Sequence, residues 1–307
     1  MTRVSVVMAA YNGERFIAEQ IRSIFLQTRP PDELIVVDDA STDLTPDILA
    51  RLQEQVPHIK VVTNSENLGV SHSFTKGVLA ASGDIVFFSD QDDVWLCNKV
   101  ETHLSLHLSQ RADLVFTDSI FTNEKLAPVG QTKMGVASRK RRGLKNEVAG
   151  SISSFRNDQA LILYLGACSG FWRHDNLVHL FWTSMGNAFY CTSALTLYRR
   201  HELSLSRGAA SRLPENRPIY HRLLDRMSKQ KGEREAVFQL LKLFDDRLPT
   251  QVRADLMTRY RTLSASVRLS ESGNVFRYFK DLVGARALNP RRVVLDLLTV
   301  FFRLRGR

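Results

Sequence analysis

The chain has 307 residues, of which 44% are hydrophobic and 24% are charged. This composition is that of a folded protein with one or two hydrophobic cores, and it excludes wholesale disorder. The three cysteines, Cys97, Cys168 and Cys191, show no CxxC spacing, which argues against a disulfide framework or a zinc site and favours a reducing compartment. Because we find no secretory leader and no apolar run of about 18 residues, we expect no membrane-spanning helix.

The net charge of +10 is unevenly distributed along the chain. Residues 208–307 contain 21 Lys and Arg against 10 Asp and Glu, whereas residues 1–207 contain 21 and 22. A basic segment of this kind is typical of proteins that bind nucleic acid or an anionic membrane surface.

Short apolar runs alternate with segments of helical spacing over the first 90 residues. The predicted strands cover residues 3–10, 34–37, 59–63 and 85–88, and the predicted helices cover residues 16–25, 42–55 and 70–81. Ser41 or Thr42 is the expected N-cap of the second helix. This alternation predicts an α/β fold whose parallel sheet is covered by helices on both faces.

The later part of the chain is less regular. A further strand is expected over residues 113–118, and residues 123–154, with the basic run Arg139–Arg142, are expected to form a flexible flap because of their length. Residues 159–165 and 188–198 are again apolar. Beyond Gly208, helical spacing with frequent Arg recurs over residues 219–228, 234–246 and 251–268.

Polar residues follow three of the predicted strands, and ligands of open α/β sheets bind beyond the carboxyl ends of the strands. Tyr11 and Asn12 follow the first strand, Asp38 and Asp39 follow the second, and the acidic run 90–93 follows the fourth. Carboxylates crowded so closely repel unless a cation offsets their charge, and Mg²⁺ or Mn²⁺ bound together with phosphates would do so. The alternatives are that 90–93 is an exposed acidic turn and that the Asp pair caps a helix.

Five segments in this order and spacing resemble the inverting family 2 glycosyltransferases. They are Val6-Val7-Met8-Ala9-Ala10-Tyr11-Asn12, residues 33–43 (ELIVVDDASTD), Asn67-Leu68-Gly69, Gly83-Asp84 and Ser89-Asp90-Gln91-Asp92-Asp93-Val94-Trp95. The resemblance covers residues 1 to about 120. It implies a GT-A type α/β fold with a mostly parallel sheet flanked by helices. The helical spacing and frequent Arg beyond Gly208 predict a helical, basic C-terminal extension after this fold.

The resemblance also implies roles for individual residues. Asp39 would accept a hydrogen bond from a pyrimidine N3–H, and Asp90 and Asp92 would form a DxD motif that holds Mn²⁺ or Mg²⁺. His201 would add a metal or phosphate contact. The implied nucleotide-binding residues are Ala10, Tyr11, Asn12, Asp38, Asp39, Asn67, Gly69, Lys76 and Asp90.

Inversion at a sugar carbon needs a general base opposite the leaving diphosphate. His174-Asp175 resembles the family's HD motif, which makes Asp175 the implied base, although an Asp at this place could instead cap a helix. The resemblance further implies that residues 1–118 form the nucleotide-sugar-binding half and that residues 119–207 form the acceptor and catalytic-base half. This second half is shorter than in relatives.

These features predict an inverting transferase that moves a sugar from a UDP- or dTDP-sugar to a glycan or lipid-linked acceptor in cell-surface polysaccharide synthesis. The DQDDVW run at 90–95 is frequent in rhamnosyltransferase-like bacterial members and favours rhamnose. The alternative, which the short 119–174 segment motivates, is a nucleotide-sugar-binding protein that has lost turnover.

Residues 275–307 combine aromatic and Leu residues with eight Lys and Arg. This pattern is typical of a helix in the interface of an anionic membrane, so we expect a cytoplasmic protein bound peripherally to the inner face of the cell membrane. The alternative is a helical appendage packed on the catalytic domain. We expect no nucleic-acid partner, since no nucleic-acid-binding motif is found.

Overall fold

The computed structural model describes residues 1–133, 150–201 and 219–272 together with Tyr278, Asp281, Val293, Asp296 and Leu297; the side chains of residues 219–227 and 270–272 are not described. The chain divides into two compact units. The first holds the described residues up to His201 except residues 170–172, and the second holds residues 170–172 and the described residues from 219 onward.

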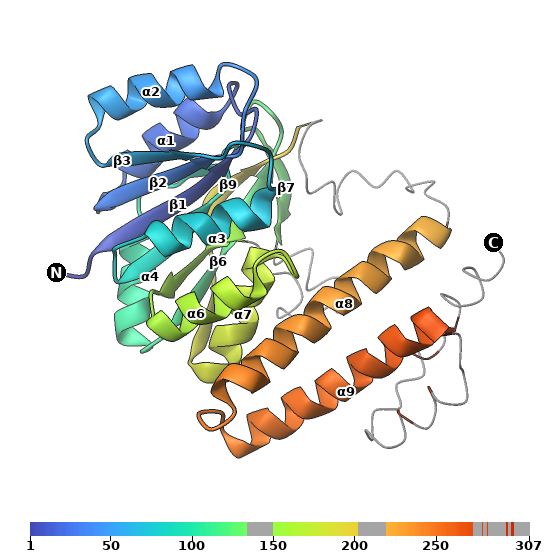
Figure 1. Cartoon of the computed structure of the whole chain (residues 1–307). Helices are drawn as coiled ribbons and strands as arrows, with labels where there is room; N and C mark the ends of the chain where they lie inside the picture. Colours follow the sequence, from blue (N-terminus) through green and yellow to red (C-terminus); the bar gives the residue numbers. More distant parts are fainter. Residues whose placement is uncertain are drawn as a thin grey trace. The chain divides into compact units, whose positions relative to one another are not determined.

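The first unit begins with the predicted alternation of strands and helices (Figure 1). Its elements are β1 (Val4–Ala10), α1 (Ile17–Phe25), β2 (Glu33–Asp38), α2 (Thr45–Gln55), β3 (Ile59–Thr63), α3 (Val70–Ala80) and β4 (Ile85–Ser89). The predicted N-cap of α2 is wrong, because the helix begins at Thr45. The Ser41 hydroxyl instead donates to Asp38 and accepts from the main-chain N–H of Asn12.

The remaining elements of this unit are shorter and less regular. They are β5 (Val94–Trp95), α4 (Lys99–Ser109), β6 (Leu114–Thr122), β7 (Pro128–Thr132), a 3₁₀ turn (Gly150–Ile152), β8 (Ser153–Arg156), α6 (Gln159–Cys168), α7 (His174–Met185) and β9 (Ala188–Arg199). The predicted flap is wrong at both ends, since β7 and β8 pair with β6 there. Residues 134–149, including Arg139–Arg142, lie outside the described residues.

In the described part of the chain, nine strands form one sheet in the order β3-β2-β1-β4-β8-β6-β9-β5, with β7 beside β6. The first four of these strands are parallel, β8 pairs antiparallel with β4 and β6, and β9 runs parallel to β6. The predicted α/β class is therefore confirmed, although the sheet is mixed. The parallel arrangement brings the carboxyl ends of β1, β2 and β4 to one edge.

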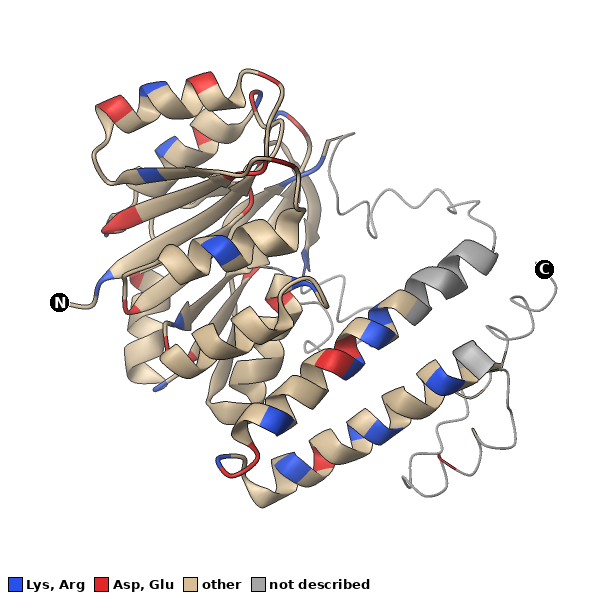
Figure 2. Cartoon of the chain, in the orientation of Figure 1, with Lys and Arg blue, Asp and Glu red and all other residues tan. Residues whose placement is uncertain are grey.

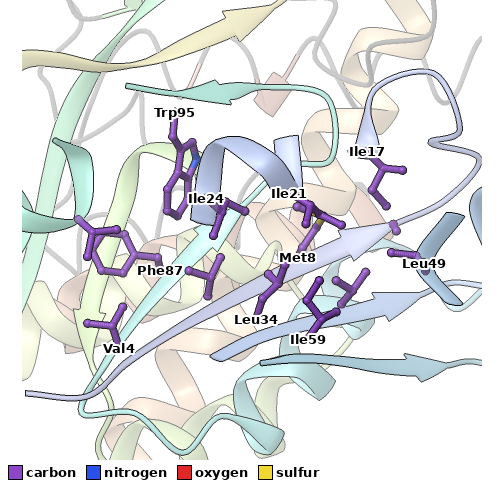
Figure 3. Packing of buried hydrophobic residues seen from close by; sticks show 14 of the residues in the cluster. Val4, Met8, Ile17, Ile21, Ile24, Leu34, Leu49, Ile59, Phe87 and Trp95 are labelled. Carbon is purple, nitrogen blue, oxygen red and sulfur yellow. The ribbon is translucent and has the colours of Figure 1, made fainter. Parts of the chain in front are cut away.

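Both faces of the parallel part of the sheet are buried. On one face, Met8 of β1 and Leu34 of β2 belong to a core cluster with Ile17, Ile21 and Ile24 of α1 (Figure 3). On the other face, Val7 of β1 lies so close to α3 that a Cβ at Gly77 would be 2.3 Å from its Cγ1. Burial on both faces explains why β1 and β2 are continuous apolar runs rather than alternating ones.

The second unit contains two long helices, α8 (Ile219–Phe244) and α9 (Thr250–Ser272), which lie side by side (Figure 1). Asp296 is buried beside α9, where its carboxylate accepts hydrogen bonds from Ser266 Oγ at 2.6 Å and Tyr278 OH at 2.8 Å. Lys and Arg recur along both helices (Figure 2). Within the described residues, no helix combines the length and apolarity required to cross a membrane.

Candidate active site

The loops that follow β1 and β2 are joined by hydrogen bonds through Asn12. This residue adopts a left-handed backbone conformation with φ of 48°, which Asn tolerates better than most residues. Its main-chain N–H donates to Ser41 Oγ at 3.0 Å, and its side-chain oxygen accepts from the N–H of Thr42 at 2.9 Å. Ala10 and Asp38, the last residues of β1 and β2, are buried, whereas the Tyr11 side chain is 45% exposed. An exposed aromatic ring beside a buried strand end can stack on a planar ligand.

Asp39 organises the neighbouring loop after β3. Its carboxylate accepts hydrogen bonds from Asn64 Nδ2 at 2.8 Å and from the N–H groups of Leu68 at 2.9 Å and Gly69 at 2.8 Å. Burial alone would raise the pKa of this carboxyl, but the donated hydrogen bonds from Asn64, Leu68 and Gly69 outweigh it and lower the pKa below the ordinary value. Asp39 is therefore held ionised at the strand end.

The other residues predicted to bind nucleotide surround this loop. Gly69 has φ of 88°, which favours glycine, and it precedes α3 with open space around its Cα. Lys76 Nζ donates to Asn64 Oδ1 at 2.7 Å. Asn67 is exposed. The sequence analysis does not single out Asn64, although this residue directly follows the third predicted strand, as Asp38 and Asp39 follow the second.

Three carboxylates crowd the turn after β4. Burial, and after it the charge of Asp92, raise the pKa of Asp90 to about 6. Burial and the charges of Asp92 and Asp90 raise the pKa of Asp93 well above its ordinary value. The Asp92 carboxylate lies 2.8 Å from His201 Nε2, so the structure brings this predicted pair together.

The chemistry of these side chains fits a hard divalent cation, because a cation would offset the like charges that raise the pKa of Asp90. Asp90 and Asp92 would be its protein ligands, with His201 beside them. In the described ranges, no cluster of three or more His, Cys, Asp or Glu side chains is arranged as a metal site.

Two buried cations that the sequence analysis did not single out lie near this turn. The Arg199 guanidinium is buried and its Nε donates to the carbonyl of Asp92 at 2.8 Å. Lys99 is fully buried, where its ammonium donates to the carbonyl of Ser151 at 2.6 Å and lies 4.0 Å from the centre of the Trp95 ring. Burial lowers the pKa of Lys99 to about 7. Only the end of an apolar run at 188–198 marked Arg199 in the sequence, and nothing in the local pattern marked Lys99.

Asp175 lies in the first turn of α7 and is 3% exposed. Arg173 Nη2 donates to its carboxylate at 2.8 Å. The side chain of Lys133 lies near both Asp175 and the turn after β4. Burial lowers the pKa of its ammonium, and the charges of Asp175, Asp90 and Asp93 partly oppose that shift. Asp175 and the β4 carboxylates therefore act electrostatically on the same ammonium, although they come from different elements.

His174 is a core residue in this structure. Its ring stacks on Phe74 with centroids 3.9 Å apart and lies edge-on to Phe88 at 4.9 Å. Neither ring nitrogen has a hydrogen-bond partner among the described residues. Burial lowers the pKa of His174 to about 4. The His of the predicted HD pair therefore positions α7 by packing.

This burial predicts a pH dependence of stability. Because the unfolded chain binds a proton at His174 near pH 6.5 and the folded chain only near pH 4, stability should fall as the pH falls between these values, by up to about 1.4 kcal/mol per pH unit. His174→Phe should flatten this part of the profile while transfer activity is kept. Thermal unfolding followed by circular dichroism from pH 4 to 8 measures it, with exposed His58→Gln as the control. An unchanged slope in the Phe variant would contradict the assignment.

The sequence is similar to a family model and to several known proteins. Residues 5–174 match the family model described as Glycosyl transferase family 2. A putative teichuronic acid biosynthesis glycosyltransferase, TuaG, of Bacillus subtilis is 36% identical over 37% of this chain and 45% of its own length. A UDP-Glc:alpha-D-GlcNAc-diphosphoundecaprenol beta-1,3-glucosyltransferase, WfgD, of Escherichia coli is 33% identical over 37% of this chain and 44% of its own length. The matches thus span less than half the length of these relatives.

Solved structures share the fold at low sequence identity. The structure of S. aureus TarS residues 1–349 in complex with UDP-GlcNAc superposes with a TM-score of 0.59 at 17% identity, covering 99% of this chain and 92% of that one. A mannosyltransferase from Pyrobaculum calidifontis in complex with GDP-Man and Mn²⁺ has a TM-score of 0.54 at 18% identity, covering 98% and 86%.

Proposed function

The chain belongs to glycosyl transferase family 2, and from this premise we propose that it is an inverting, metal-dependent transferase that moves a sugar from a nucleotide diphosphate sugar to a glycan or lipid-linked acceptor. One observation carries the proposal. The start of α7, which holds Asp175, packs against the end of β4 through the rings of His174 and Phe88, whose centroids are 4.9 Å apart. β4 in turn pairs with β1, and the residue after β1 is Tyr11. The proposed nucleotide site, phosphate site and catalytic base would thus lie close together.

In the proposed reaction, Asp175 accepts the proton of an acceptor hydroxyl as the hydroxyl oxygen forms a bond to the sugar C1 atom. The bond from C1 to the diphosphate oxygen breaks on the opposite face, which inverts the configuration. Lys133 and Arg173 place positive charge beside Asp175. Tyr11 and Asp39 hold the nucleoside, and Asp90 faces the diphosphate. A divalent ion at Asp90 and Asp92, when bound, would neutralise the leaving diphosphate.

We propose UDP or dTDP as the donor nucleotide, with rhamnose favoured by the run from Asp90 to Trp95. The names of relatives support a UDP-sugar, since one acts on UDP-Glc and TarS binds UDP-GlcNAc. Isothermal titration of UDP and dTDP, each with and without Mn²⁺ or Mg²⁺, tests the donor site. We expect one nucleotide to bind at least about tenfold more tightly with metal. If neither nucleotide bound under any of these conditions, the proposal would be abandoned.

Assays of sugar transfer and donor hydrolysis on the same samples distinguish the two candidate functions. An active enzyme should hydrolyse or transfer the sugar of the donor that it binds. Metal-dependent binding without transfer or hydrolysis would favour a nucleotide-sugar-binding protein, for which the Arg173–Asp175 ion pair and the short 119–174 segment provide a reason. In that case the ion pair would hold Asp175 away from an acceptor.

We further propose that the acceptor is presented at an anionic membrane surface and that residues 275–307 attach the chain there. Most of this segment lies outside the described residues. The diphosphoundecaprenol acceptor in the name of one relative supports a lipid-linked substrate.

The attachment is tested by sedimentation of the full chain with phosphatidylglycerol and phosphatidylcholine vesicles. Binding to the anionic vesicles alone is expected. Changing Arg303, Arg305 and Arg307 together to Gln should weaken it about a hundredfold, because each basic residue near such a surface contributes about 1 kcal/mol. Arg51→Gln on α2 serves as the control. Equal binding by the triple variant would exclude this segment as the anchor.

A further inference from the structure

The side chain of Gln91 connects two parts of the site that are far apart in sequence. Gln91 lies in the turn after β4, and its amide faces the main chain of Tyr11, 80 residues earlier. Its Oε1 atom accepts from the N–H of Tyr11 at 2.9 Å, and its Nε2 atom donates to the carbonyl of Tyr11 at 2.9 Å. Because one planar amide meets both main-chain groups of one residue, it fixes the distance and the orientation between the two loops.

Gly13 provides the space for this contact. A Cβ atom at Gly13 would lie 2.3 Å from Gln91 Oε1 and 2.7 Å from its Cδ. The φ angle of Gly13 lies outside the left-handed region, so the close approach of the Gln91 amide, rather than backbone conformation, accounts for a glycine here.

The two loops that Gln91 joins have different contacts on their other sides. Asn12 connects the β1 loop to the β2 loop through Ser41 and Thr42. Arg199 holds the β4 turn through the carbonyl of Asp92. Gln91 therefore links the nucleoside side of the proposed donor site to its phosphate side.

We propose that Gln91 is a positioning residue that sets the spacing between the nucleoside and diphosphate subsites, with Gly13 as the residue that admits it. The inference rests on the proposed function, because it concerns the same donor site. A ligand that occupies both subsites gains affinity from their fixed separation, whereas a ligand that occupies one does not.

Gln91→Met removes both hydrogen bonds with little change in side-chain volume. Titrations would compare UDP with uridine and dTDP with thymidine, in the presence of Mg²⁺. For the nucleotide that the wild type binds, we expect a loss of about tenfold in the diphosphate's affinity, as for two neutral hydrogen bonds. The affinity for the nucleoside should stay within about twofold.

Gly13→Ala disrupts the same contact by placing a Cβ atom against the Gln91 amide. The new Cβ should displace the amide and give the same split between diphosphate and nucleoside. The double variant should bind no more weakly than either single variant, because both remove one interaction. Gln53→Met, at an exposed site on α2, serves as the matched control. Hydrogen exchange at the Tyr11 amide should be faster in both single variants without any nucleotide.

The possible failures are distinguishable. If the wild type binds neither UDP nor dTDP, the proposed function fails and this inference falls with it. If the wild type binds one of them and Gln91→Met either leaves its affinity unchanged or weakens nucleoside and diphosphate equally, the positioning role alone is overturned. Additive losses in the Gly13→Ala, Gln91→Met double variant would also overturn it.

Discussion

Replacing Asp92 with Asn is expected to lower sugar transfer by at least about 10²-fold while the fold is kept. The carboxylate would lose the charge that a divalent ion needs, and removal of one strong electrostatic contact to a leaving group costs about that much. The turn itself should persist, because Arg199 holds the main-chain carbonyl of Asp92 and an Asn side chain can still contact His201. Steady-state transfer and a thermal melt measure the two effects.

Asp47→Asn is the matched control for this variant. Asp47 is exposed in the first turn of α2 and is not one of the residues proposed to bind donor or metal. It should leave both transfer and the dependence on Mn²⁺ or Mg²⁺ unchanged. Transfer by Asp92→Asn at the wild-type rate, with the same metal dependence, would remove Asp92 from the proposed site.

Asp175→Asn should lower kcat by about 10² to 10⁴-fold, as expected for the loss of a general base. Nucleotide affinity should change by less than about twofold, since Asp175 lies on α7 and the proposed nucleotide contacts come from the strand ends. The Asn side chain can still accept the hydrogen bond that the Asn176 N–H donates to Asp175, and Arg173 is largely exposed and can be solvated. Single-turnover transfer and nucleotide titration on the same sample separate chemistry from binding.

Asp158→Asn is the control for a carboxylate at a helix start. Asp158 caps α6 through the N–H of Ala160, a role that Asn fills equally well. It should therefore show wild-type transfer. A loss of nucleotide binding in Asp175→Asn that matches its loss of kcat would instead indicate that Asp175 supports the donor site.

The positions of the strand-end residues followed from local pattern. The apolar runs of β1 to β4 and the helical spacing between them predicted a parallel sheet, and a parallel sheet places its carboxyl ends at one edge. Tyr11, Asp39 and Asp90 could be selected for this reason before any contact was known. Their predicted roles in binding remain proposals.

Other features depended on contacts between distant segments. The length of residues 123–154 predicts a flap, but β7 and β8 at its two ends are strands because they pair with β6. The predicted helix cap failed at Ser41, whose hydroxyl binds Asp38 and Asn12 instead.

By itself, then, the sequence determined the α/β class, the order of the first elements and the edge at which to look for a site, because these depend on periodicity and on turn residues that act locally. Only the tertiary structure decided that the His174 ring is packed in the core, that Lys133 and Asp175 lie near Asp90, and that the Gln91 amide hydrogen-bonds the main chain of Tyr11. Each of these depends on contacts between residues tens of positions apart in the sequence. Their geometry exists only once the sheet has brought the strand ends together.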